Sequence, residues 1–218
     1  FVLSHDSYST SNLIELDSSF MDELLNLVEN VTHYYNSYQF AQGLQITEEF
    51  FWNTFTDNYL ELVKKRVFNS EGDDKASAVT SLRMGLSVIL RLLAPVLPTI
   101  TDEIWSWCFS DETKTLSIHQ SKWPNKEEFK ELNKSKYKNS LEVAIKAIRS
   151  VRQSKTSEGI GLGKPVEKMK ITTNQENLEI IDFIFEDFSN ASNCFNFDKE
   201  KIDDENIKVE IISKIEDL

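Results

Sequence analysis

Helical periodicity of apolar residues runs through the first half of this 218-residue chain and restricts its fold more than any other feature. Apolar side chains that recur every three or four residues line one face of an α-helix. A first helix is predicted over 17–38, with Asp17, Ser18 or Ser19 as its capping residue. A second is predicted over 40–68, and its apolar stripe consists of Phe40, Leu44, Phe51, Phe55, Tyr59, Leu62 and Val63, widened by Trp52.

Two further helices are expected before residue 110. One covers about 73–94 and stops at Pro95, and it is apolar on most sides, so it should lie at the centre of the fold. The other covers about 99–108, and Ile100 and Trp105 are expected to point into the core. Four helices with short connections predict an antiparallel bundle.

The second half of the chain changes from a purely helical pattern to a mixed one. A helix is predicted over 136–156, and the closely spaced glycines that follow end it. Strands are then predicted over 166–172, 193–197 and 207–213, with a helix over 175–188. The fold class expected is therefore mainly α, an antiparallel helical bundle followed by a small α/β unit.

Four regions are expected along the chain. Residues 1–16 form an N-terminal extension, and 17–109 form the helical bundle. Residues 110–135 are a polar connector, and 136–218 combine a basic helix with the small α/β unit. The chain lacks an initiator Met, which suggests a fragment of a longer protein.

Several classes of site are not indicated by the sequence. It has no Walker A loop and no GxGxxG motif, and its three His do not fall at metal-ligand spacing, so no catalytic site, cofactor or metal is predicted. No segment reaches the roughly 18 uninterrupted apolar residues of a membrane span, so no membrane contact is expected. Cys108 and Cys194 are far apart in the sequence, which favours a reducing compartment and a cytoplasmic protein.

Charge is distributed unevenly along the chain. The formal net charge of -12 argues at first against a nucleic-acid partner. Residues 130–170, however, carry 11 Lys and Arg against 4 Asp and Glu, a net charge of +7. Acidic segments lie on both sides of this band. Since local potential matters more for docking than the total, the basic band is the candidate binding surface.

The basic residues that could bind a phosphate group lie on the helix predicted over 136–156. Positions 138, 142, 146, 149 and 153 share one helix face, and Glu142 is the acidic residue among them. Lys and Arg side chains on such a face neutralise phosphates, whereas the alternative is an ordinary solvated helix face. The candidate RNA-binding residues are Arg149, Arg152, Lys146, Lys155 and Lys138.

Two further cations and several aromatic residues are left with open alternatives. Lys65 and Arg66 are candidates for RNA contact, but a role at the end of their own helix is equally plausible. Arg152 lies at the edge of the apolar face and could instead support a buried polar contact. Trp52 and Trp105 are assigned to the core, although unpaired RNA bases do stack on aromatic rings.

Three segments of the chain resemble class I aminoacyl-tRNA synthetases. Residues 49–64, EFFWNTFTDNYLELVK, are similar to the pattern FFWNxFxDxYLExxK of valyl-tRNA synthetases. Residues 90–105, LRLLAPVLPTITDEIW, and 117–124, SIHQSKWP, resemble segments of the valyl, isoleucyl and leucyl group. A weaker match is IRSVR at 148–152, like the IRxxR helix of that family. The WNxF and YLE elements favour the valyl members.

The resemblance implies a helical anticodon-binding region that positions valine-specific tRNA. The parent enzyme would join valine to its tRNA with ATP and Mg²⁺, in catalytic and editing domains of the same polypeptide. The HIGH and KMSKS motifs of that catalytic domain are absent from this sequence, so the chain itself is expected to be non-catalytic and monomeric. The alternatives are a helical scaffold that binds protein without RNA contact, and a free-standing enzyme for which no motif is present.

Overall fold

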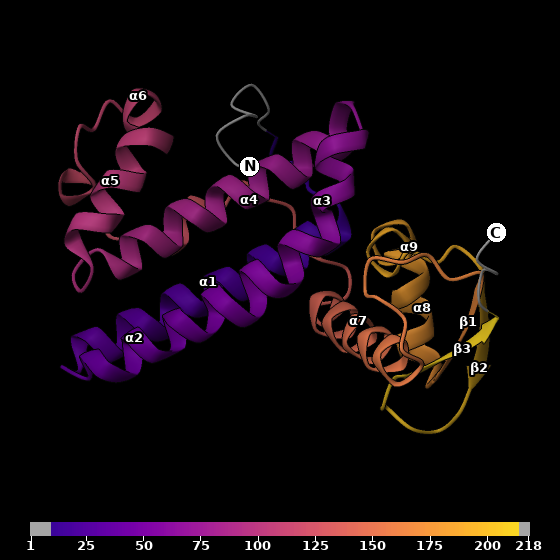
Figure 1. The fold of residues 1–218 in the computed structure, drawn as a ribbon. Helices are drawn as coiled ribbons and strands as arrows, with labels where there is room; N and C mark the ends of the chain where they lie inside the picture. The colour runs from indigo at the N-terminus through magenta and orange to yellow at the C-terminus, as the bar shows by residue number, and fades with distance from the viewer. Residues whose placement is uncertain (1–9, 214–218) are drawn as a thin grey trace.

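The helices of the first half pack side by side as an antiparallel bundle. The computed structural model describes residues 10–213. Helix α1 (Glu15–Asn36) lies beside a continuous helix made of α2 (Phe40–Glu49), η2 (Phe50–Tyr59) and α3 (Leu60–Asn69), and α4 (Gly72–Leu93) packs across both (Figure 1). The helices predicted over 17–38, 40–68 and 73–94 are thus confirmed, with small differences at their ends.

The middle of the second predicted helix is a π-helix. Segment η2 keeps helical backbone angles at both ends, so α2, η2 and α3 form one uninterrupted rod. Its extra residues per turn rotate Phe55 and Tyr59 into the core, where the Tyr59 ring stacks on Phe20 of α1 with ring centroids 3.9 Å apart. Long π-helical segments are rare and occur frequently at functional sites.

Helix α4 is the central helix of the bundle, as its composition predicts. By length and mean hydropathy it resembles a membrane span, but 61% of that apolar window is buried inside the fold. Gly85 lets the neighbouring helices approach closely, because a Cβ atom there would lie 2.9 Å from both Phe20 Cζ and Phe55 Cε2. The apolar character of α4 is therefore explained by its place in a protein core.

Shorter elements complete the bundle and lead to the second unit. Helix α5 (Pro98–Cys108) begins with Pro98 at its first turn, and α6 (Ser110–Thr113), η3 (Ile118–Gln120) and η4 (Lys126–Phe129) follow. The connector packs back on α1 through Trp123, whose Nε1 donates to Thr32 Oγ1 at 2.8 Å. Asn133 likewise donates its amide to the carbonyl of Leu13 at 2.8 Å. The predicted polar connector is thus fixed to the bundle.

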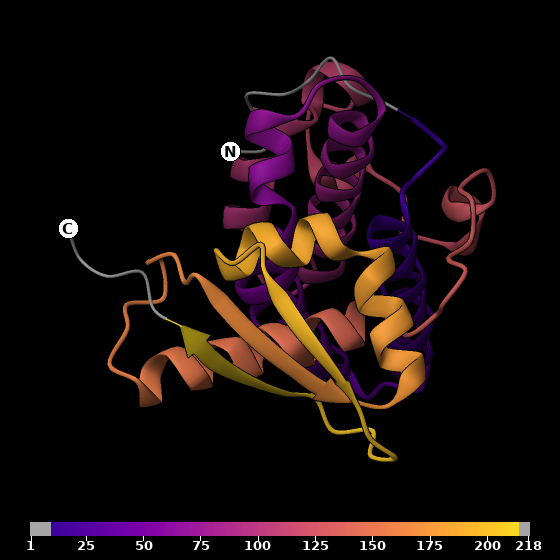
Figure 2. The same ribbon diagram turned by 90° about the vertical axis from the view of Figure 1, so that its right-hand side faces the viewer.

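Helices cover one face of a small sheet in the second unit (Figure 2). The elements are α7 (Ser140–Ser157), β1 (Lys168–Thr173), α8 (Gln175–Phe183), α9 (Phe185–Ser192), β2 (Phe197–Lys201) and β3 (Lys208–Ser213). The strand order is β2-β1-β3, with β1 parallel to β2 and antiparallel to β3. Parallel neighbours need a crossover connection, and α8 with α9 provides it.

Alternation along β1 buries its inward side chains and connects this sheet to the bundle core. Met169, Ile171 and Thr173 are buried, while the residues between them are partly exposed. One apolar cluster runs from α1 and α4 through α7 to β1, so the two units share a core. The mainly α fold with a terminal α/β unit is confirmed, and 64% of the residues that the structure describes are helical.

Several local predictions are wrong. The helix predicted over 175–188 is divided at Ile184, and the strand predicted over 193–197 begins at Phe197. The residue that caps α1 is Ile14, while Asp17 is fully buried. Three side chains expected in the core, Phe40, Trp52 and Ile100, are each about half exposed, whereas Trp105 is buried as predicted.

Candidate nucleic-acid interface

The exposed face of α7 carries the cations that remain accessible. Glu142, Lys146, Arg149 and Gln153 are all exposed, which confirms the face predicted from helical spacing. Lys146 Nζ lies 2.7 Å from Glu142 Oε1, a pair in which both side chains are more than half exposed. Such surface pairs contribute little to stability, so Lys146 remains available to an anion that binds it more strongly than Glu142 does.

Arg149 and Lys138 have no competing partner in the part of the chain that the structure describes. Among the residues described, neither side chain takes part in a hydrogen bond or ion pair, and both are exposed. Lys138 lies in the turn before α7 rather than within it. With Lys146 they form a surface of three cations, called here the α7 cationic face.

Arg152, on the adjacent side of the same helix, has a structural contact instead. Its Nη1 donates to Asn58 Oδ1 at 3.0 Å, and its Nη2 donates to the carbonyl of Asp57 at 2.8 Å. Both acceptors belong to η2, so Arg152 connects α7 to the π-helical segment of the bundle. The alternative left open by the sequence, a polar contact inside the protein, is the one observed.

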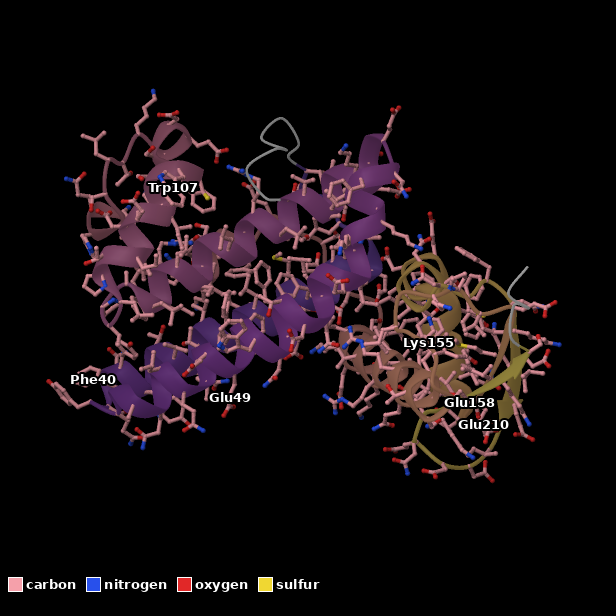
Figure 3. The ribbon with its side chains drawn as sticks, viewed as in Figure 1. Phe40, Glu49, Trp107, Lys155, Glu158 and Glu210 are labelled. Carbon is pink, nitrogen blue, oxygen red and sulfur yellow. The ribbon has the colours of Figure 1, made fainter. Side chains whose placement is uncertain are left out.

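Lys155, in the last turn of α7, is buried inside the second unit (Figure 3). Only 1% of its surface is exposed. Its Nζ donates to the carbonyls of Leu162, Lys164 and Ser192 at 3.0, 2.7 and 2.8 Å. Burial lowers the pKa of the Lys155 ammonium. The prediction that Lys155 belongs to a solvent-facing cationic surface is therefore not met, because its three protons are used within the chain.

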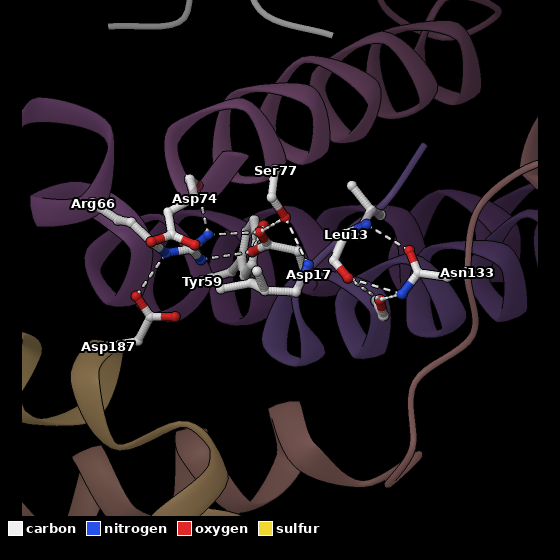
Figure 4. Close-up of polar contacts among 10 residues, drawn as sticks. Leu13, Asp17, Tyr59, Arg66, Asp74, Ser77, Asn133 and Asp187 are labelled. Carbon is white, nitrogen blue, oxygen red and sulfur yellow. Dashed lines mark hydrogen bonds and ion pairs between the residues drawn. The ribbon is translucent and has the colours of Figure 1, made fainter. Parts of the chain in front are cut away.

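Arg66 is also buried, in a polar network that joins three helices and the second unit (Figure 4). Its Nη1 and Nη2 donate to the two oxygens of Asp17 at 2.8 and 2.9 Å, and its Nε donates to Asp187 at 2.9 Å. Tyr59 and Ser77 donate their hydroxyls to the same Asp17 carboxylate. Arg66 is thus a structural cation and not one that faces RNA.

Lys65, next to Arg66, is partly buried at the boundary between the units. Its Nζ donates to Asn193 Oδ1 at 2.8 Å and lies 5.9 Å from the centroid of the Phe195 ring. The chain therefore places Lys65 against its own second unit. Of the seven cations singled out from the sequence, three have exposed side chains, and these are Lys138, Lys146 and Arg149.

A groove beside this surface contains residues that sequence reasoning missed. It has a volume of about 380 Å³ and lies between α1 and the start of η2. Its polar wall consists of the side chains of Glu23, Asn26, Asn30, Glu49 and Asn53. Asn26 and Asn30 lie one turn apart on the polar face of α1, a spacing that could have pointed to a shared surface.

The described residues show no arrangement suited to metal binding. No group of three or more His, Cys, Asp or Glu within residues 10–213 is placed to hold an ion. The groups with the largest changes in pKa, Tyr59, Arg66 and Asp187, belong to the buried network. A cationic helix face and a groove lined by three asparagines are among the accessible features of residues 10–213.

Comparison with known proteins specifies the class of this helical bundle. The family model described as the anticodon-binding domain of tRNA ligase matches residues 17–171, and the chain belongs to this family. The match covers the bundle, the connector, α7 and the start of β1.

The relatives in this family are named valine--tRNA ligases. The chain is 33% identical to the valine--tRNA ligase of Thermobifida fusca over 90% of its length, and 37% identical to that of Cutibacterium acnes over 63%. It is also 35% identical to the enzyme of Wolbachia pipientis over 78% of its length. The chain spans about a fifth of the length of these relatives. The resemblance seen in the sequence motifs is confirmed.

Proposed function

We propose that the chain is the tRNA-binding part of a valine--tRNA ligase, and that the α7 cationic face holds the anticodon arm of valine tRNA. The observation that carries the proposal is the family match together with the accessibility of Lys138, Lys146 and Arg149. Phosphate contacts position an RNA, while base contacts supply specificity. The three cations therefore account for docking and not for the choice of tRNA.

The chemistry of the parent ligase belongs to other parts of the same polypeptide. ATP and Mg²⁺ would be used there, in a catalytic domain that carries the HIGH and KMSKS motifs, and an editing domain would remove mischarged products. The residues of this chain supply no step of that reaction; their task is to bind and orient the tRNA. We expect the protein to be a monomer and to act in the cytoplasm.

The salt dependence of tRNA binding tests the phosphate contacts. The 218-residue chain is titrated with a valine tRNA transcript and with an anticodon-substituted copy, at about 50 and 200 mM salt. Three phosphate contacts predict that affinity falls about 20- to 40-fold between these concentrations. Binding that does not change with salt would contradict the role of the cationic face.

A pair of matched variants assigns the effect to this surface. Lys146→Ala combined with Arg149→Ala is expected to reduce the slope of log affinity against log salt by about two. The control combines Lys201→Ala with Lys208→Ala, two exposed cations at the sheet. Equal changes of this slope in the two double variants would mean that the salt dependence reflects the total charge of the chain and not the α7 cationic face.

A second candidate function, docking to another protein surface, is favoured by exposed apolar residues at the far end of the bundle. Ile100 and Trp107 are exposed by 53% and 61%, and they lie two turns apart on one face of α5. Leu97 and Leu116 are exposed nearby in the sequence. Helix α5 lies at the end of the bundle opposite the second unit (Figure 1), and an apolar patch there suits contact with the remainder of the ligase. Trp107→Ser would weaken that contact without changing tRNA affinity.

A further inference from the structure

Polar contacts attach α7 to the helical bundle at two places along its length. At its N-terminal end, the backbone N–H of Leu141 donates to Ser19 Oγ at 3.0 Å. Just before the helix, the N–H of Tyr137 donates to Glu15 Oε1 at 2.8 Å. Both acceptors belong to α1. The second attachment lies in the C-terminal half of α7, where the guanidinium of Arg152 reaches η2.

The acceptors of Arg152 are themselves held in place. Asn58 is buried, and its Oδ1 accepts from Arg152 Nη1 at 3.0 Å. Its Nδ2 donates to the carbonyl of Asn53, five residues earlier in η2. The carbonyl of Asp57 accepts from Arg152 Nη2 at 2.8 Å. Both ends of the Asn58 amide are thus bound, and Arg152 meets a surface of fixed orientation.

This contact lies directly beside the exposed cations of α7. Arg149 precedes Arg152 by one helical turn, so the two side chains are neighbours on the helix surface. The apolar side of this turn, with Ile148 and Val151, is buried. Apolar burial is non-directional, whereas a hydrogen bond requires a defined distance and angle. The Arg152 contact is therefore the interaction that fixes the rotation of this half of α7 against η2.

We propose that Arg152 and Asn58 are positioning residues for tRNA binding, which hold α7 against η2 so that the α7 cationic face meets the phosphates at a fixed spacing. The inference rests on the proposed function. In this role neither residue touches the RNA. A surface that is already ordered before binding avoids the free-energy cost of ordering it in the complex.

The surroundings of Arg152 oppose a direct phosphate contact. Its side chain is partly buried and lines a cleft of about 460 Å³ between the two units, together with Asp57 and Glu61. The carboxylates of these two residues repel a phosphate group. An Arg152 side chain drawn toward RNA would also leave the buried Asn58 without its donor, which is costly.

Substitution on both sides of the contact tests the positioning role. The 218-residue chain and its variants are titrated with a valine tRNA transcript over a range of salt concentrations. Arg152→Ala and Asn58→Ala are each expected to weaken binding by about fivefold or more, the lower end of typical coupling between two sites. Neither should change the slope of log affinity against log salt, whereas Arg149→Ala should lower that slope by about one.

Two further variants separate a positioning role from a contact with RNA. Arg152→Ala combined with Asn58→Ala should bind no more weakly than either single variant, because both remove the same interaction. Arg152→Lys keeps the charge, but its single nitrogen does not reproduce the two-pronged contact of the guanidinium. It should therefore bind more weakly than wild type with an unchanged salt slope.

A matched control removes the effect of stability. Phe109→Leu alters a buried residue of the second apolar cluster, at α5 and away from α7. It should lower the melting temperature and keep both the tRNA affinity and the salt slope. All titrations are made at a temperature at which thermal unfolding curves show every variant to be folded, so a merely structural role of Arg152 would leave affinity unchanged.

The outcomes distinguish this assignment from the proposed function. No salt-dependent binding of tRNA by the wild-type chain would overturn the proposed function and the positioning role with it. Normal affinity in Asn58→Ala, or a salt slope lowered by about one in Arg152→Ala, would overturn the positioning role alone and leave the cationic face standing.

Discussion

Arg66 of α3 donates its Nε–H to Asp187 of α9 at 2.9 Å, and this ion pair connects the bundle to the α/β unit. The same guanidinium binds Asp17 of α1 through both terminal nitrogens. Its partners are separated from it by 49 and 121 residues in the sequence. One buried cation therefore fixes α1, α3 and α9 relative to one another.

Removal of Arg66 is expected to destabilise the protein strongly. Arg66→Met keeps much of the side-chain volume but leaves Asp17 and Asp187 buried without a counter-charge. Breaking a buried pair in this way costs about 3–5 kcal/mol of unfolding free energy. Urea unfolding measures the change. Lys64→Ala, which removes an exposed pair with Glu61, is the control and should change stability by less than about 0.5 kcal/mol.

The pH dependence of stability should contain a contribution from Asp187. Burial raises the pKa of Asp187 to about 6, although Arg66 opposes the shift. Burial also disfavours the Arg66 cation, but Asp17 and Asp187 outweigh it and raise its pKa, so Arg66 stays charged. Asp187 accepts a single hydrogen bond from Arg66, so burial outweighs this contact and the Asp187 carboxyl takes up a proton as the pH falls through about 6.

The sign of this contribution follows from proton binding in the two states. An unfolded Asp titrates near about 3.9, so the native protein binds more protons between about pH 4 and 6. The unfolding free energy therefore falls as the pH rises through this window, by about 2–3 kcal/mol from this group. Unfolding of wild type and Asp187→Asn between pH 4 and 8 measures it. A difference between the two proteins that is constant with pH would contradict the assignment.

Substitution of Gly85 should destabilise the bundle although alanine favours helices. Alanine in place of an interior helical glycine contributes about 1 kcal/mol of stability. At Gly85, however, the added methyl group would lie 2.9 Å from the Phe20 and Phe55 rings, and overpacking of this kind costs about 1–3 kcal/mol. Gly85→Ala is thus expected to lower the melting temperature, while Gly163→Ala, with open space around it, should not.

Loss of the Lys155 ammonium should release the loop after α7. Lys155→Met leaves the carbonyls of Leu162, Lys164 and Ser192 without their donor. The hydrogen bond to Ser192 is the buried one, and loss of the donor of one buried acceptor costs about 1–3 kcal/mol. Hydrogen exchange of residues 158–166 should accelerate relative to that of α4. Arg149→Ala, on the exposed face of α7, should leave exchange unchanged and lower only tRNA affinity. The same exchange pattern in both variants would contradict the role of Lys155 in holding the loop after α7.

The sequence by itself determined the helices, their antiparallel order and the family. Apolar residues at helical spacing specify which faces are buried, and this local rule holds for α1, α3, α4 and α7 alike. It fails at Trp52, because the π-helical turn of η2 changes the rotation per residue and leaves that ring 54% exposed. The exposed positions of α7 were also predictable, since they follow from the same spacing.

Only the tertiary structure decided which cations are available to a ligand. Arg66 and Lys155 have the same charge as Arg149, and charge alone does not separate them, whereas the place of Arg152 at the edge of the apolar face already allowed a buried polar contact. The protons of Arg66, Arg152 and Lys155 are bound by a carboxylate of α9, by an amide of η2, and by carbonyls of the loop after α7 and of Ser192 in α9. A buried charge is tolerated only where such partners converge, and residues far apart in the sequence converge only in the folded chain.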